Sequence, residues 1–337
     1  MSSESDAGEI VVLTLREHAD GVWITRLVDR LVDCLARDGR TIRVRSLEDW
    51  LGRGRLVSGA GFGGVAGIVN RVSPSDAADP ALFKACASLL SSAASSGVPV
   101  VNGPASYAVC ASKWTQHVLF ARAGLASPTT VACYRDGDPR RRSSAEDVVG
   151  RARDAGMAGD VLVKPNSGGF GRGIRRIRLD DAGSSPGDFL PEFDDRVMLL
   201  QQYESPLALY RVWFLNGRVQ CATERTPGGP GDEFAGACAG SCSVAADLPR
   251  TCRVPDEVRA EVEGKILPLI PDAFCGSVEF LVRGGDDGDA RLYFDLNLLS
   301  TLPLRSDNTS GSWDDSYDPW EELAKEIIGF FSASRAR

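Results

Sequence analysis

Histidine is nearly absent from this chain, which has only two among its 337 residues, His18 and His117. Histidine is the side chain that most often serves as a general base near neutral pH. Chemistry that depends on a histidine base therefore has few candidates here. His18 follows the first predicted strand, and we expect a solvated loop residue there.

Excess positive charge and long apolar runs are also missing. The chain carries 38 Lys and Arg against 46 Asp and Glu, a net charge of −8, which argues against a protein that coats nucleic acid. No apolar run is long enough to span a bilayer, and the acidic residues 1–7 lack the features of a signal peptide. We therefore expect a cytoplasmic protein without a nucleic-acid or membrane partner.

The nine cysteines form no recognisable metal-binding pattern. Cys238 and Cys242 are the only close pair, and no second Cys or His pair lies near them in the sequence, which disfavours zinc. In a reducing cytosol we expect most of the cysteines to be small buried apolar residues.

The first hundred or so residues alternate between predicted strands and helices. Strands are predicted at residues 10–15, 41–47, 65–72 and 98–101, and helices at residues 22–36 and 81–94. This order is typical of an open parallel α/β sheet, whose ligands bind at the carboxyl ends of the strands. No glycine fingerprint follows the first strand, which disfavours a dinucleotide site. Arg71 lies at one such end, where it would bind an anionic substrate or form a surface ion pair.

The remainder of the chain mixes helices with hairpins. Helices are predicted at residues 106–123, 145–155, 255–270 and 320–331, and strands at residues 129–133, 161–164, 174–179, 197–202, 210–214, 218–224, 276–282 and 291–296. Asn216-Gly217 is a strong turn signal between two of these strands. Residues 135–142 and 180–195 are predicted to be exposed loops, residues 226–231 a Pro/Gly turn and residues 233–242 a loop of small residues.

A glycine-rich segment, residues 161–174, has neither the Gly-Lys-Ser/Thr ending of a Walker loop nor a helix after it. Its pattern predicts a strand ending at Lys164, a turn with four glycines, and a second strand. Glycines let the backbone approach a ligand and present its N–H groups to anionic oxygens, and a lysine adds a point charge to the same phosphates. On this segment alone, a phosphate-binding flap and an ordinary hairpin with a surface lysine both remain open.

A second group of residues falls on the late hairpin. Asp295 and Asn297 share one face of their strand, because side chains alternate, and strand pairing would bring Glu279 close to them. Carboxylates among apolar residues are costly unless satisfied, and Mg²⁺ prefers oxygen ligands of this kind. The alternative is a pair of exposed strand ends with polar tips.

Taken together, these motifs resemble the ATP-grasp superfamily, and their order is most similar to its RimK-type, glutamate-ligase-like branch. The resemblance covers residues 106–303. It rests on residues 110–113 with 124–128, on 161–174, on 199–203, on 210–212 with 215–219, and on Glu279 with 295–297.

The resemblance implies an α/β fold with an α+β C-terminal part. An N-terminal open parallel α/β domain, residues 1–105, would precede an ATP-grasp fold of two α+β subdomains. Residues 106–200 would form the smaller subdomain with the glycine flap, and residues 201–337 the C-terminal subdomain with the metal site.

The resemblance also implies a role for individual residues. The ATP phosphates would contact Lys113, Lys164, Ser167, Gly168, Gly169, Phe170 and Gly171. Adenine would lie against Gln201, Gln202, Tyr203 and Glu204. The catalytic residues would be Arg211, which stabilises the transferring phosphoryl group, and Lys164. The Mg²⁺ ligands would be Glu279, Asp295 and Asn297, with Mn²⁺ as an alternative ion. The substrate would lie near Arg71, Ser300, Thr301 and Arg305.

The implied activity is an ATP- and Mg²⁺-dependent carboxylate–amine ligase that forms an amide through an acyl phosphate and releases ADP. Its partners would be a small carboxylate and an amine, amino acid or peptide-like, and a homo-oligomer is one alternative for its assembly. Two other activities stay open: an ATP-grasp kinase of small molecules, and an ATP-binding protein without turnover. The last is motivated by Asp295 where the family usually has Glu, and by residues 207–209, Leu-Ala-Leu, where it often has a ribose-binding acid.

Overall fold

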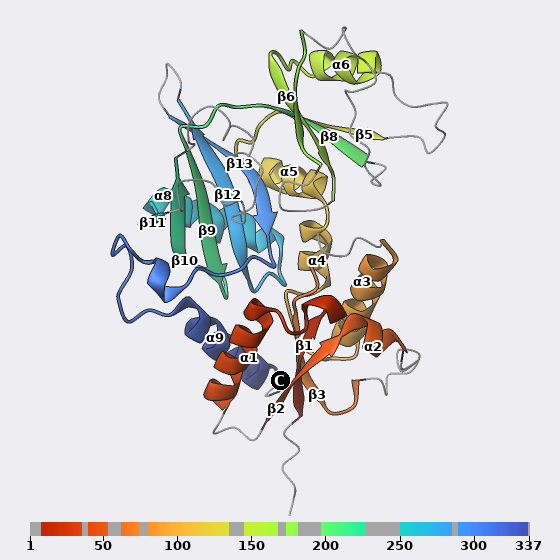
Figure 1. Ribbon diagram of the computed structural model, residues 1–337, viewed down its shortest axis with the longest axis vertical. Helices are drawn as coiled ribbons and strands as arrows, with labels where there is room; N and C mark the ends of the chain where they lie inside the picture. The colour runs from red at the N-terminus through yellow and green to blue at the C-terminus, as the bar shows by residue number, and fades with distance from the viewer. Residues whose placement is uncertain are drawn as a thin grey trace, which may run out of the picture.

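The computed structural model describes residues 8–35, 40–52, 62–73, 80–134, 145–167, 173–180, 197–226, 250–284 and 289–335. Three sheets organise these residues (Figure 1). One is a four-stranded parallel sheet near the N-terminus, and the other two are antiparallel sheets formed by the rest of the chain.

The N-terminal sheet has the strand order β2-β1-β3-β4. Its strands are β1 (Glu9–Thr14), β2 (Thr41–Ser46), β3 (Val65–Asn70) and β4 (Val100–Val101). All of the pairings are parallel, as predicted. The central strands β1 and β3 are nearly continuous apolar runs because helices cover both faces of the sheet.

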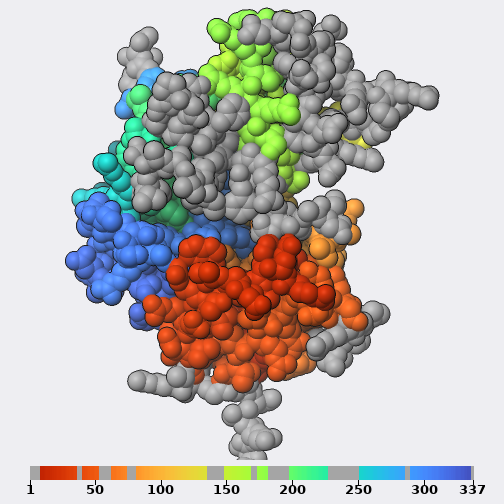
Figure 2. All heavy atoms as spheres, in the orientation of Figure 1, coloured from red at the N-terminus to blue at the C-terminus, as the bar shows by residue number. Residues whose placement is uncertain are grey.

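Helices from both ends of the chain cover this sheet. They are α1 (Val22–Leu35), α2 (Leu47–Gly52), α3 (Pro80–Ser95) and α9 (Pro319–Arg335). The C-terminal helix α9 lies beside α1, where Trp23 stacks on Trp320 with ring centroids 5.8 Å apart (Figures 1 and 2). Gly67 of β3 permits this packing, since a Cβ there would meet the Phe331 ring at 2.5 Å. The helix α2 was not predicted.

Within the described residues, none of the helices has the length and apolar character that a membrane span would need. The limits of the three predicted domains stay predictions. The helix α9 packs both on the N-terminal sheet and against the larger antiparallel sheet, where Phe274 contacts Phe330.

The single helix predicted at residues 106–123 is wrong, because the structure has two helices there. They are α4 (Pro104–Cys110) and α5 (Lys113–Arg122). Ser112 separates them with extended dihedral angles, and its side chain accepts a hydrogen bond from the backbone N–H of Thr115. Ser112 is thus the N-cap of α5, a role that serine performs well and that the apolar pattern of the segment conceals.

The smaller antiparallel sheet has the order β5-β8-β6-β7. Its strands are β5 (Thr130–Tyr134), β6 (Asp160–Pro165), β7 (Arg175–Arg178) and β8 (Val197–Gln202), and α6 (Ala145–Asp154) covers one face. β6 and β7 pair antiparallel, as predicted for the strands that flank the glycine-rich segment.

The larger antiparallel sheet has the order β11-β10-β9-β12-β13. Its strands are β9 (Ala208–Leu215), β10 (Arg218–Arg225), β11 (Arg250–Cys252), β12 (Cys275–Arg283) and β13 (Ala290–Asn297). The helix predicted at residues 255–270 is only partly α-helical. After α8 (Asp256–Glu261) it continues as a π turn (Val262–Ile266) and a 3₁₀ turn (Leu267–Leu269), because Pro268 has no N–H to donate.

Asn102 joins the N-terminal sheet to the larger antiparallel sheet. Its side-chain oxygen accepts the backbone N–H groups of Phe274 and Cys275 at 3.0 Å each, and its amide donates to the carbonyl of Leu298. Asn102 is 1% exposed and has a φ of 54°, in the left-handed region that asparagine tolerates. This one side chain therefore satisfies three backbone groups, two at the start of β12 and one directly after β13.

Asp272 makes a second connection. Its carboxylate accepts the backbone N–H groups of Ala105 and Ser106 at 2.8 Å each, at the start of α4. A carboxylate is favourable at this end of a helix, where the N–H groups lack partners within the helix.

We expect Asn102→Ala to lower the free energy of unfolding by about 3 kcal/mol, because it leaves buried N–H and C=O groups without partners. Asn216→Ala is the matched control, since Asn216 also has a positive φ, 47°, but lies exposed in a turn. Urea denaturation of both variants separates the effect of the buried hydrogen bonds from the effect of replacing an asparagine with positive φ. Equal losses would contradict the role assigned to the buried hydrogen bonds.

Candidate active site

Strand β12 brings three charged residues together, because its register pairs Glu279 with both of its neighbours. Glu279 lies opposite Arg211 of β9 on one side and opposite Asp295 of β13 on the other. The Arg211 guanidinium donates to the Glu279 carboxylate, and the two side chains are 12% and 13% exposed. Residues separated by up to 84 positions in the sequence thus form a row across one sheet face.

Lys113 reaches the same row from α5. Its Nζ lies 3.1 Å from Oδ1 of Asp295. The helix is attached to β13 by Gln116, whose amide donates to the carbonyl of Leu296 at 3.0 Å and accepts its N–H at 3.2 Å. Gln116 was not among the predicted site residues, although its three-residue spacing from Lys113 puts both on neighbouring parts of one helix face.

Asn166 connects the end of β6 to the start of α5. Its backbone oxygen accepts the N–H of Lys113 at 2.9 Å, and its side-chain oxygen accepts the N–H of Trp114 at 2.9 Å and the hydroxyl of Ser112 at 3.2 Å. Asn166 follows Lys164 by two residues, so its hydrogen bonds hold the end of β6, which carries Lys164, against the start of α5, which carries Lys113. Asn166 was not among the predicted site residues.

Lys164 is 3% exposed and approaches the site from β6. Its Nζ donates to Oε1 of Gln201 at 2.8 Å. The charge of Lys164 acts on Asp295, where it contributes to lowering the pKa. Lys113 and Lys164, from two different elements, therefore face one carboxylate.

The two carboxylates are perturbed in opposite directions. Burial raises the pKa of Glu279, Arg211 opposes this, and the negative charge of Asp295 raises it further. Burial also raises the pKa of Asp295, but the charge and hydrogen bond of Lys113, with Lys164 and Arg211, lower it below its ordinary value. Two adjacent acids whose pKa values are driven apart are typical of functional sites.

The donor set fits a hard divalent cation. Glu279 and Asp295 face each other across two strands, and Asn297 lies two residues beyond Asp295 on the same face. All of these donors are oxygens, as Mg²⁺ prefers. No cluster of three His, Cys, Asp or Glu that could hold a metal ion occurs among the described residues.

The predicted adenine-binding residues lie at the end of β8. The Gln202 side chain is bound to the backbone of Ala158 and Asp160, while the Arg176 guanidinium lies 4.0 Å from the centre of the Tyr203 ring. Glu204 pairs with Arg283 at 3.0 Å, a contact between the end of β8 and the end of β12.

Ser167 is exposed at the end of the described part of the glycine-rich segment. The other predicted flap residues, Gly168, Gly169, Phe170 and Gly171, lie outside the described residues. Their contact with phosphate stays a prediction.

The four predicted substrate residues are less closely grouped. Arg71 lies near the start of β12, where it opposes the effect of burial on the pKa of Cys275. Ser300 is buried and donates to the carbonyl of Thr301 at 3.4 Å. Arg305 is exposed in a 3₁₀ turn, Arg305–Asp307, and its charge acts on Asp314. Their role in substrate binding stays a prediction.

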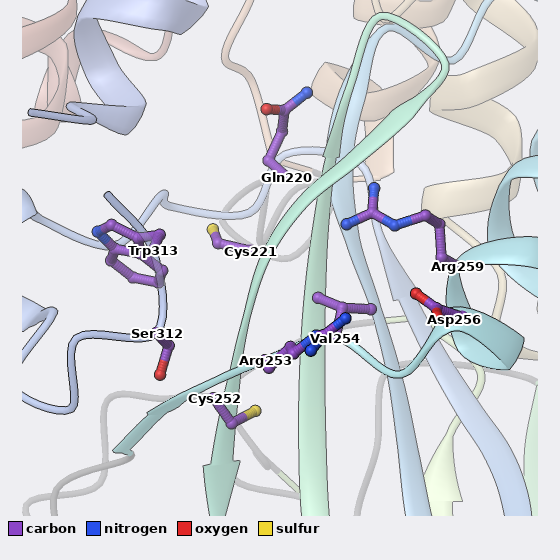
Figure 3. Close-up of a pocket in the computed structure, with 9 residues that line it drawn as sticks. All are labelled: Gln220, Cys221, Cys252, Arg253, Val254, Asp256, Arg259, Ser312 and Trp313. Carbon is purple, nitrogen blue, oxygen red and sulfur yellow. The ribbon is translucent and has the colours of Figure 1, made fainter. Parts of the chain in front are cut away.

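A cavity of about 140 Å³ lies elsewhere, between β10, β11 and the segment that leads to α9 (Figure 3). Cys221, Cys252, Arg253 and Trp313 are among its lining residues. None of the predicted site residues lines it, so the charged row on β9, β12 and β13 is the candidate site on chemical grounds.

Comparison with known proteins gives matches in structure alone. No protein-family model matches this sequence, and no curated protein matches it. D-cycloserine synthetase DcsG matches with a TM-score of 0.63 at 16% identity, over 96% of this chain and 99% of that chain.

Two further solved structures match with similar scores. D-alanine–D-alanine ligase from Bacillus anthracis, complexed with ATP, has a TM-score of 0.64 at 14% identity, over 98% of each chain. ATP-grasp ligase PsnB, complexed with a phosphomimetic variant of its minimal precursor, Mg and ADP, has a TM-score of 0.61 at 16% identity, over 96% of this chain and 98% of that chain. The chain therefore has the fold of the ATP-grasp ligases, and the predicted fold class is confirmed.

His117 gives this site a measurable pH dependence. Burial, and then the charges of Lys164 and Lys113, lower the pKa of His117 from 6.5 to about 3. Between these two values the unfolded chain binds a proton that the folded chain does not, so stability falls as the pH falls from 6.5 towards 3. Between pH 7 and pH 5 we expect the free energy of unfolding to fall by about 2 kcal/mol less in His117→Gln than in the unchanged protein.

The measurement is the free energy of unfolding at each pH, for the variant and the unchanged protein. Val118→Ala is the control, because Val118 lies on the exposed side of the same helix and does not titrate. Parallel pH curves for His117→Gln and the unchanged protein would contradict the prediction.

Proposed function

We propose that this protein is an ATP- and Mg²⁺-dependent carboxylate–amine ligase that forms an amide through an acyl phosphate. The observation that carries the proposal is the convergence of Lys113, Lys164, Arg211, Glu279 and Asp295, from four strands and one helix region, on one buried site. The ATP-grasp fold supports it, because the solved structures with this fold include ligases complexed with ATP, or with Mg and ADP.

Each charged side chain has a task in this reaction. Lys113 and Lys164 bind the phosphates of ATP from two sides and orient the γ-phosphoryl group. Arg211 donates to the equatorial oxygens of the phosphoryl group as charge develops there. Glu279 and Asp295, with Asn297, would hold Mg²⁺. When bound, the ion would neutralise the charge of the phosphates and position them.

The chemistry needs no histidine. An oxygen of the substrate carboxylate attacks the γ-phosphorus, the bond to the β-phosphate oxygen breaks, and ADP leaves. The nitrogen of an amine then attacks the acyl carbon, the bond to phosphate breaks, and the nitrogen loses a proton. The protein contributes position and charge, as is typical of phosphoryl transfer, and the scarcity of histidine is consistent with this.

The proposed partners are a small carboxylate and an amine, amino acid or peptide-like. In support, one matched structure is by its name a D-alanine–D-alanine ligase, and another is a ligase complexed with a variant of its minimal precursor. Cytoplasmic location and assembly as a homo-oligomer stay expectations from sequence.

Hydroxylamine trapping tests the proposal. The purified protein is incubated with Mg·ATP and panels of carboxylates and amines, and ADP release is followed. We expect a carboxylate that supports ADP release to give a hydroxamate when hydroxylamine replaces the amine. A phosphate ester without hydroxamate would establish a kinase instead, and persistent ATP binding without any product would establish a binding protein.

We expect Lys164→Met to weaken ATP binding by about tenfold or more, because it removes a charged donor to phosphate while keeping an apolar stem of similar length. Titration calorimetry with a non-hydrolysable ATP analogue and Mg²⁺ measures this. An unchanged dissociation constant would remove Lys164 from the nucleotide site.

We expect Asp295→Asn to lower turnover by at least about a hundredfold and to raise the Mg²⁺ concentration needed for half-maximal rate. The change removes the charge of a proposed metal ligand and keeps its shape. Asp33→Asn, on the exposed side of α1, is the control and is expected to retain full activity. Retention of full rate by Asp295→Asn would contradict the metal assignment.

A further inference from the structure

The inner side of α5 carries a histidine that the reaction does not use. His117 is 6% exposed and lies one helical turn after Lys113. Its Nε2 is 3.0 Å from Nε2 of Gln201 and 3.4 Å from Oγ1 of Thr130. Gln201 is itself buried, and its Oε1 accepts from Lys164 at 2.8 Å. A continuous chain of hydrogen bonds thus runs from α5 through β8 to the lysine of β6.

The donors and acceptors in this series of hydrogen bonds can be assigned from the chemistry of its members. Lys164 has donors alone, so the amide of Gln201 must present its oxygen to it. The Gln201 NH₂ group then faces His117, whose Nε2 must be an acceptor, with the proton of the neutral ring on Nδ1, a buried atom without a hydrogen-bond partner among the described residues. Thr130 offers a second acceptor at 3.2 Å, since its own hydroxyl donates to the carbonyl of Pro128 at 2.9 Å.

The reverse orientation of the amide is unfavourable. It would bring the NH₂ group against the Lys164 ammonium, donor to donor, whichever tautomer His117 adopts. Burial makes the mismatch costly, because no solvent is available to satisfy either group. Lys164 therefore sets the orientation of the Gln201 amide, and His117 accepts from the NH₂ group that this orientation turns towards α5.

We propose that His117 is a positioning residue, which acts through Gln201 to hold the Lys164 ammonium where it binds phosphate. The proposal rests on the nucleotide-binding function proposed above and adds to it a residue outside the phosphate contacts. His117 does not touch the nucleotide. Its contribution to affinity passes through Lys164 and requires an acceptor at the position of its Nε2.

A double-mutant cycle on ATP affinity tests this, measured by calorimetry with a non-hydrolysable ATP analogue and Mg²⁺. We expect His117→Leu to weaken binding by about tenfold, because the amide loses one of its two acceptors. His117→Gln should retain affinity within about threefold, since its side-chain oxygen can accept in the same place. In a Lys164→Met background, His117→Leu should change affinity by less than twofold.

Non-additivity distinguishes positioning from a general structural role. A packing defect would lower affinity by the same factor with or without Lys164, and that result would overturn the proposal. Equal losses for His117→Leu and His117→Gln would also overturn it, because an acceptor would then not matter. Val118→Ala, on the exposed side of α5, is the control and should bind as the unchanged protein does. Thermal unfolding of each variant verifies that it is folded at the assay temperature.

Different experimental results would overturn the proposed function and the positioning role. If the unchanged protein binds no ATP analogue, the proposed function is wrong and the positioning role falls with it. If the unchanged protein binds and Lys164→Met weakens binding, but His117→Leu has the same effect in both backgrounds, only the positioning role is wrong.

Discussion

Two partly buried carboxylates side by side are the constraint on which this structure depends. Glu279 and Asp295 face each other on adjacent strands, and burial of such charges is unfavourable unless cations or hydrogen bonds compensate. Arg211 compensates Glu279, and Lys113 compensates Asp295. The helix α5 and the strands β9, β12 and β13 must therefore keep their relative positions, since a shift of any one would leave a carboxylate without its cation.

The polar contacts around the site serve that register. Gln116 fastens α5 to β13, Asn166 fastens β6 to α5, and Asn102 fastens the N-terminal sheet to β12 and to the residues after β13. The side chains of Gln116 and Asn102 donate and accept at once, while the side chain and backbone oxygens of Asn166 both accept from the start of α5. The charged residues supply the proposed chemistry, and the amides supply its geometry.

The elements of the fold were largely predictable, because their patterns are local. Strand β8 follows from an apolar run at 197–202, and the β9–β10 hairpin from Asn216-Gly217. The break at Ser112 was missed, since the apolar periodicity runs through it and the cap acts by a hydrogen bond to Thr115. The pairing of Glu279 with Asp295 was predictable from the alternation of side chains along a hairpin. Lys113, which pairs with Asp295, was predicted only from the resemblance to ATP-grasp proteins.

The sequence by itself determined which residue types carry charge among apolar neighbours, and so which chemistry is open to the protein. It also determined the alternation of strands and helices, because periodicity is a property of neighbouring residues. The tertiary structure decided which distant residues meet. No sequence pattern assigned a role to Asn166 or His117, and their hydrogen bonds exist only because β6, β8 and α5 pack together. Hydrogen bonds require particular distances between particular atoms, and those distances are set by packing across the whole chain.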